Sequence, residues 1–170
     1  MVESGRGNVL GIGSAAQYWM EIVLPNAVRF RTHPAALEAF NICSSIWHQI
    51  DWIANDPSTN PTSETLTALR VKFEAECPSL SVFHDITTLS KHKVISRPRA
   101  GLVETKVEFL GATFHFGGEE PLSEHPSKYT VVLESGDEID LGELVEAALR
   151  YWRAFFVGHS VGNAIPQESI

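Results

Sequence analysis

The chain has 170 residues, of which 44% are hydrophobic and 20% are charged, and its 13 Lys+Arg against 21 Asp+Glu give a net charge of −8. This composition excludes collagen-like, low-complexity and intrinsically disordered chains. The length is enough for a sizeable core, and we expect residues 1–170 to form a single domain. The net acidity argues against a general nucleic-acid coat protein.

Apolar runs in the sequence are far shorter than the ~20 residues that cross a bilayer, so we expect no membrane partner. The first residues lack the pattern of a signal peptide. The two cysteines, Cys43 and Cys77, lie in apolar helical patterns without a CxxC neighbour. We therefore expect reduced core thiols, a cytoplasmic location, no structural zinc and no cofactor.

Helical periodicity dominates residues 14–95. Ser14 is a candidate N-cap, and Pro25 predicts a kink or a break in the first helical run. The strongest pattern begins at Thr32-His33-Pro34 and predicts a long amphipathic helix to about Asn55. Its apolar stripe is Leu37, Phe40, Cys43, Trp47, Ile50 and Ala54.

Two shorter helices are predicted next. The first is capped by Thr62 or Ser63 and ends near Cys77-Pro78, because a residue that precedes proline disfavours the helical conformation. The second is capped by Ser79 and fades after His92.

After residue 102 the spacing of the apolar residues changes from the helical period to an alternation of every second residue. Val103, Thr105 and Val107 alternate with charged residues, as in a half-buried strand, and the β insertion extends over about 102–139. Asp140 and Glu143 have the spacing of a capping box, which begins a final helix over 140–158, and residues 160–170 form a frayed tail. We therefore predict an α+β, mainly α fold. It is a helical bundle of four to five helices with an antiparallel β meander inserted before the C-terminal helix.

The first candidate site is His48-x-x-Asp51, because positions i and i+3 share one helix face. A carboxylate beside an imidazole fixes its tautomer and raises its basicity. The alternative is an ordinary surface pair that contributes little to stability.

The second candidate site pairs Asp85 with His92, seven residues apart on one helix face. The basic residues around His92 would form an anion-binding edge, or would simply stabilise the negative end of a helix dipole. These residues are Lys91, Lys93, Arg97 and Arg99.

If the two helices pack side by side, His48, Asp51, Asp85 and His92 meet in one groove that suits acid–base chemistry or a divalent metal. The Glu-x-x-His repeats of helical-bundle metal sites are absent from the sequence, so we predict no metal.

The segments HQIDW at 48–52 and FHDITTLSKHK at 83–93, followed by a β insertion and a final helix, resemble a group of uncharacterised bacterial proteins. Some of these are similar to the HEPN superfamily of helical bundles, and the resemblance covers about residues 14–100 and 140–159. Many HEPN proteins are RNases of toxin and antiphage systems that carry Arg-x(4–6)-His with a polar residue after the arginine. The resemblance implies Arg153 and His159 as the catalytic pair, although Ala154 follows the arginine here.

Two functional hypotheses follow. The first is a non-catalytic binding or interaction module that forms a homodimer and has a protein or RNA partner. The alternative is a HEPN-like, metal-independent RNase, in which a histidine is the acid or base and a cationic side chain stabilises the phosphorane.

Overall fold

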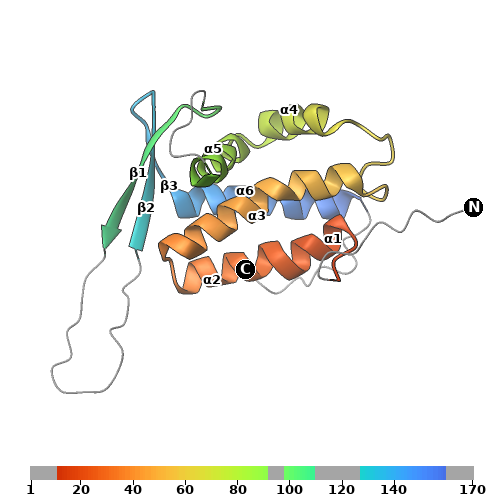
Figure 1. Ribbon diagram of the computed structural model, residues 1–170, viewed down its shortest axis with the longest axis horizontal. Helices are drawn as coiled ribbons and strands as arrows, with labels where there is room; N and C mark the ends of the chain where they lie inside the picture. The colour runs from red at the N-terminus through yellow and green to blue at the C-terminus, as the bar shows by residue number, and fades with distance from the viewer. Residues whose placement is uncertain (1–10, 92–97, 110–126, 160–170) are drawn as a thin grey trace, which may run out of the picture.

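The computed structural model describes residues 11–91, 98–109 and 127–159. It is a bundle of helices with a three-stranded antiparallel sheet at one end, placed in the chain before the final helix (Figure 1). This confirms the predicted α+β, mainly α class. None of the helices within the described ranges has both the length and the apolar character needed to cross a membrane.

The first helical run passes through α1 (Ala15–Tyr18), the π-helical turn η1 (Trp19–Val23) and α2 (Leu24–Thr32). Ser14 caps it as predicted, because its Oγ accepts a hydrogen bond from the Gln17 N–H at 3.1 Å. Pro25 lies in the first turn of α2, directly after η1. Proline has no N–H to donate to the preceding turn, and the wider π turn comes where that bond would fall. The chain therefore stays helical through Pro25 without a break.

Helix α3 (Ala36–Asn55) is the central helix of the bundle and ends where the sequence predicts. It begins two residues after Pro34, because Ala35 is still extended at the N-cap. Of the predicted stripe, Cys43, Trp47 and Ile50 are buried, whereas Leu37 is 64% exposed and Phe40 is only half-buried. The fully buried large side chains of α3 are Ile42, Ile46, Gln49, Ile50 and Ile53.

Three further helices complete the bundle. They are α4 (Leu66–Glu76), α5 (Ser79–Lys91) and α6 (Leu141–Gly158). Thr65 caps α4, three or two residues after the predicted caps, and its hydroxyl accepts from the Ala68 N–H at 3.2 Å. Asp140 caps α6 as predicted, with Oδ1 accepting from the Gly142 N–H at 2.7 Å.

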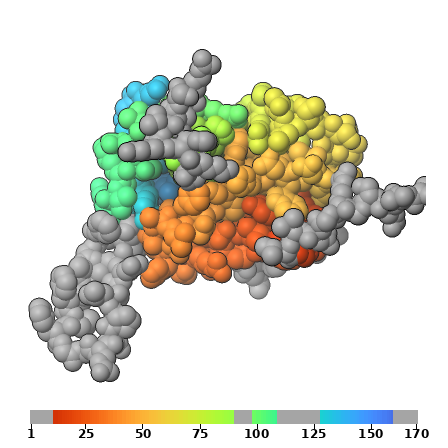
Figure 2. Space-filling model, viewed as in Figure 1, coloured from red at the N-terminus to blue at the C-terminus, as the bar shows by residue number. Residues whose placement is uncertain are grey.

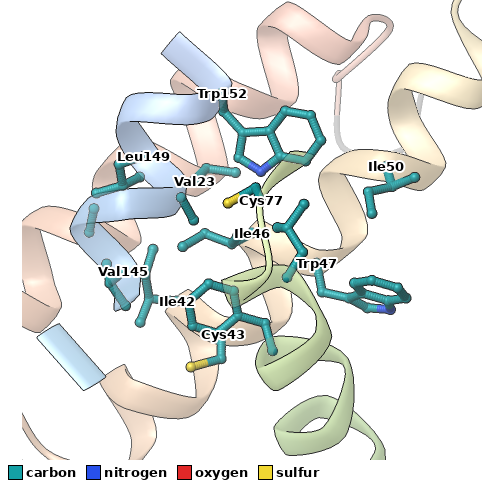
Figure 3. Packing of buried hydrophobic residues seen from close by; sticks show 14 of the residues in the cluster. Val23, Ile42, Cys43, Ile46, Trp47, Ile50, Cys77, Val145, Leu149 and Trp152 are labelled. Carbon is teal, nitrogen blue, oxygen red and sulfur yellow. The ribbon is translucent and has the colours of Figure 1, made fainter. Parts of the chain in front are cut away.

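The core lies where α6 meets α3 and η1. Figure 3 shows Ile42 and Ile46 directed toward Val145 and Leu149, with Trp47 on the side away from them. Four large aromatic side chains pack around the C-terminal half of α6, and each is less than 2% exposed. They are Trp19, Phe73, Trp152 and Phe156. Burial of side chains of this size supplies most of the free energy of folding.

The sheet has the order β1-β2-β3, from β1 (Leu102–Phe109), β2 (Ser127–Leu133) and β3 (Glu138–Asp140). Tyr129 and Val131 of β2 are buried, and the Tyr129 ring lies 6.4 Å from the Phe30 ring of α2. The predicted strand at β1 is present, but the expected half-burial is wrong, because residues 103–108 are all exposed. Val103 and Val107 are 60% and 44% exposed.

Candidate functional site

A polar pocket of about 350 Å³ opens between α3, α4 and α5. Three different helices supply its walls, so its composition depends on the tertiary fold. It is lined by Trp47, His48, Asp51, Arg70, His84, Thr87 and Thr88.

Helix α3 supplies one wall through residues one turn apart. His48 and Asp51 both line the pocket, in agreement with their predicted common face. Trp47 lies beside them and is only 4% exposed, so it belongs to the core as well as to the pocket.

Helix α4 supplies Arg70, which spans the pocket toward α3. Its Nη2 donates to Asp51 Oδ1 at 2.8 Å, and its guanidinium lies 5.2 Å from the centre of the Trp47 ring. Both charged side chains are about one-third exposed, so the pair itself contributes little to stability. The Nε of Arg70 is buried and has no hydrogen-bond partner within the described structure.

Helix α5 supplies His84, whose neighbour Asp85 has no solvent exposure. The His84 Nδ1 lies 2.9 Å from Asp85 Oδ1. The same carboxylate accepts from the backbone N–H of Arg99 at 2.9 Å and of Ala100 at 2.8 Å. These charge-assisted bonds offset the cost of burying the carboxylate.

The bond to Asp85 also fixes the chemistry of the His84 ring. A carboxylate only accepts hydrogen bonds, so the Nδ1 of His84 carries the proton that faces it. In the neutral ring, Nε2 is then an acceptor on the opposite edge. His84 lines the pocket, and its side chain is 20% exposed.

Two guanidinium groups and one imidazole contact the indole of Trp47. The guanidinium of Arg99 lies 5.6 Å from its ring centre, and the His84 ring meets it edge-on at 4.9 Å. Arg99 also pairs with Glu74 of α4. The indole thus holds Arg70 and Arg99 near the pocket through cation–π contacts.

The structure places the predicted acid–base residues as follows. His48 and Asp51 line the pocket, and Asp85 lies behind it and contacts it through His84. His92 lies outside the described residues. Of the predicted anion-binding edge, Lys93 and Arg97 also lie outside them, and Lys91 is described only as the last backbone position of α5. The side chain of Arg99 alone is described, and it lies against Trp47.

Arg153 and His159 lie on α6 and at its C-cap, and neither lines the pocket. Two guanidinium nitrogens of Arg153, Nε and Nη2, are buried without a hydrogen-bond partner among the described residues. His159 is exposed, and its Nδ1 lies 2.8 Å from the carbonyl oxygen of Phe155, a terminal acceptor of α6. A capping role accounts for this contact.

Sequence reasoning missed His84 and Arg70. The signal for His84 was present, because His84, Thr87 and Thr88 have the i, i+3, i+4 spacing of one helix face and Asp85 follows the histidine. Arg70 lies on another helix, and its local sequence carries no sign of the pocket.

Within residues 11–91, 98–109 and 127–159, no group of three or more His, Cys, Asp or Glu side chains is arranged to hold a metal ion. Comparisons of this chain with protein-family models, with curated proteins and with solved structures found no significant match.

Proposed function

We propose that this chain is a non-catalytic binding module whose pocket receives a small ligand with an anionic group. The observation that carries the proposal is the lining of the pocket, in which the Arg70 guanidinium lies beside the hydroxyls and imidazoles of two other helices. A planar guanidinium binds carboxylate and phosphate oxygens through two parallel bonds.

The charges and the volume of the pocket both favour a small anionic ligand. Asp51 is the one carboxylate among the lining residues, and Arg70 already compensates it. An anionic ligand would share Arg70 with Asp51 and take its further donors from the threonines and imidazoles. The volume of about 350 Å³ lies at the low end for small-molecule pockets, which suits a phosphate monoester or a small carboxylate.

Calorimetric titration with inorganic phosphate and ribose 5-phosphate tests the proposal. We expect Arg70→Gln to weaken binding by roughly 10- to 100-fold, because a hydrogen bond to a charged group contributes about 1.5–3 kcal/mol. Lys72→Gln is the matched control, since Lys72 is an exposed cation on the same helix and does not line the pocket. Equal affinity of the two variants would contradict the proposal.

The proposed module is a cytoplasmic homodimer with a protein or RNA partner. The two cysteines are free and buried, which is consistent with a reducing compartment. Sedimentation at several concentrations tests the dimer, and co-purification followed by mass spectrometry of protein and nucleic acid identifies the partner.

A metal-independent RNase, as the HEPN resemblance implies, is the second candidate, and the His84–Asp85 contact favours it. In this mechanism His84 Nε2 accepts the proton of a ribose 2′-hydroxyl, whose oxygen attacks the adjacent phosphorus. Protonated His48 gives its proton to the departing 5′-oxygen, which leaves a 2′,3′-cyclic phosphate and a 5′-hydroxyl. Arg70 would stabilise the phosphorane charge.

Incubation with single-stranded and structured RNA separates the two candidates. Cleavage that is lost in His84→Ala but kept in His92→Ala and His159→Ala assigns the activity to this pocket. Cleavage lost only in His159→Ala assigns it to the end of α6, and binding without cleavage supports the non-catalytic module.

A further inference from the structure

Strand β1 forms an edge of the sheet at the end of the molecule away from α4 (Figures 1 and 2). Among the described strands only β2 pairs with it, so one row of its backbone N–H and C=O groups has no strand partner there. An open edge is a template for a further strand. The edge also carries the exposed side chains of Val103 and Val107.

We propose that a second copy of this chain pairs antiparallel along β1, with the two-fold axis at Thr105. This inference deepens the homodimer of the proposed function and rests on it, but it does not depend on the pocket. The two sheets would join into one continuous sheet through an isologous interface.

Backbone geometry restricts the possible registers. Alternate residues of a strand direct their N–H and C=O groups to the same edge, and an antiparallel ladder joins residues that both face the new neighbour. In a symmetric pair, the two-fold axis must therefore pass through a residue and not between two residues. Each residue of β1 is a possible position for this axis. The choice of axis decides which side chains of the two copies lie opposite one another.

The register centred on Thr105 is self-complementary. It places Glu104 opposite Lys106 of the second copy, twice by symmetry, and Thr105 opposite itself. Opposite charges that face each other across a ladder are favourable. Val107 then lies near Val103, and the regular alternation of β1 ends at this residue, because the β1–β2 register shifts between Leu102 and Glu104.

The neighbouring centres are less favourable. A centre at Glu104 places that carboxylate opposite itself. A centre at Lys106 places the ammonium opposite itself and Glu104 opposite Glu108. Like charges in these positions are destabilising. A centre at Val107 pairs Lys106 with Glu108, but it uses only residues 105–109 of the described strand.

The side chains of this surface are available to a second copy. Lys106 pairs with Glu138 of its own chain, yet both side chains are about half exposed, and an ammonium has three donors. A pairing of this length covers less than the ~1,000 Å² of a stable interface, so the dimer should dissociate on dilution.

Charge reversal tests the register in the full chain. Glu104→Lys and Lys106→Glu each place like charges opposite one another, and we expect each to weaken dimerisation by about tenfold or more in sedimentation equilibrium. The double variant restores both pairs and should return to within about twofold of the wild type. Glu21→Lys, an exposed residue of η1, is the charge control, and circular dichroism confirms that each variant is folded.

A cysteine at the proposed axis gives an independent readout. Cys43 and Cys77 are buried, so an introduced thiol is the reactive one. Thr105→Cys should form a covalent dimer on mild oxidation, whereas Val107→Cys should form little, because only the residue on the axis lies directly opposite its own copy, within a small adjustment of disulfide geometry.

Three results would overturn the inference. Preferential cross-linking of Val107→Cys would place the axis elsewhere. A dimer that ignores both charge reversals would form through another surface, and the homodimer of the proposed function would stand. A strict monomer at every concentration would remove the homodimer and this interface together, while the pocket would still be tested by Arg70→Gln.

Discussion

The imidazole Nδ1 of His84 lies 2.9 Å from Oδ1 of Asp85, a carboxylate with no solvent exposure. The same carboxylate binds the backbone amides of Arg99 and Ala100 just before β1. One buried side chain therefore orients the pocket histidine and attaches the start of the sheet to the bundle. A change at Asp85 should affect both.

Asp85→Asn should lower the free energy of unfolding by about 2–4 kcal/mol, because the amide carries no charge and directs an NH₂ group at one of its donors. Urea unfolding at neutral pH measures this loss. Asp137→Asn is the control, since Asp137 lies in an exposed turn, and it should change stability by less than about 0.5 kcal/mol. Similar effects of the two variants would show that the buried carboxylate is not needed.

Trp47→Ala should cost about 3–5 kcal/mol, because it removes a large side chain that is 4% exposed. Phe40→Ala, on the same helix but half-buried, should cost less, on the order of 1–2 kcal/mol. Thermal and urea unfolding of both variants give the comparison. A loss under about 1 kcal/mol at Trp47 would mean that this face of α3 does not belong to the core.

Burial raises the pKa of Tyr18 to about 12, and the negative charge of Asp51 adds to the shift. An unfolded tyrosine ionises near pH 10, so the folded chain holds this proton more tightly. The contribution to stability is complete below pH 10 and is lost as the pH rises toward 12, by about 2–3 kcal/mol in all.

Tyr18→Phe removes that part of the pH dependence. We expect the free energy of unfolding of the variant to fall less than that of the wild type between pH 9 and pH 12 in urea titrations. Other groups with raised pKa, such as Tyr151, remain in both chains and cancel in the difference. Parallel curves for the two chains would count against a buried Tyr18 phenol.

Arg153→Met should leave the free energy of unfolding unchanged or raise it by about 1 kcal/mol. The substitution keeps an apolar stem and removes two buried nitrogens that have no partner within the described residues. Differential scanning calorimetry measures the change. A large loss of stability would show that the guanidinium has a partner that compensates its burial.

The helix ends that depend on residues close in the sequence were predictable from the sequence. Ser14 and Asp140 cap helices through bonds to amides two or three residues away, and these are visible as N-cap residues in the sequence. The end of α3 near Asn55 was also predictable, because the loop composition begins at the next residue.

Contacts between distant segments were not predictable in this way. Asp85 meets Arg99 and Ala100 across 14 and 15 residues of sequence, and Arg70 meets Asp51 across 19. Alternation in β1 showed which residues share a face, but it could not show whether another element covers that face. For this reason the sequence predicted a half-buried strand, whereas Val103 and Val107 are exposed in the structure.

The bonds from Asp85 to the amides at 99 and 100 also define a place where the chain can be lengthened. This anchor and the packing of Tyr129 on Phe30 both hold the sheet against the bundle, so the number of residues that connect α5 to the anchor matters little. Each doubling of a closed loop costs only about 0.6 kcal/mol of closure entropy. A reporter domain or affinity tag grafted into residues 92–97 should therefore leave the bundle and the sheet assembled as they are.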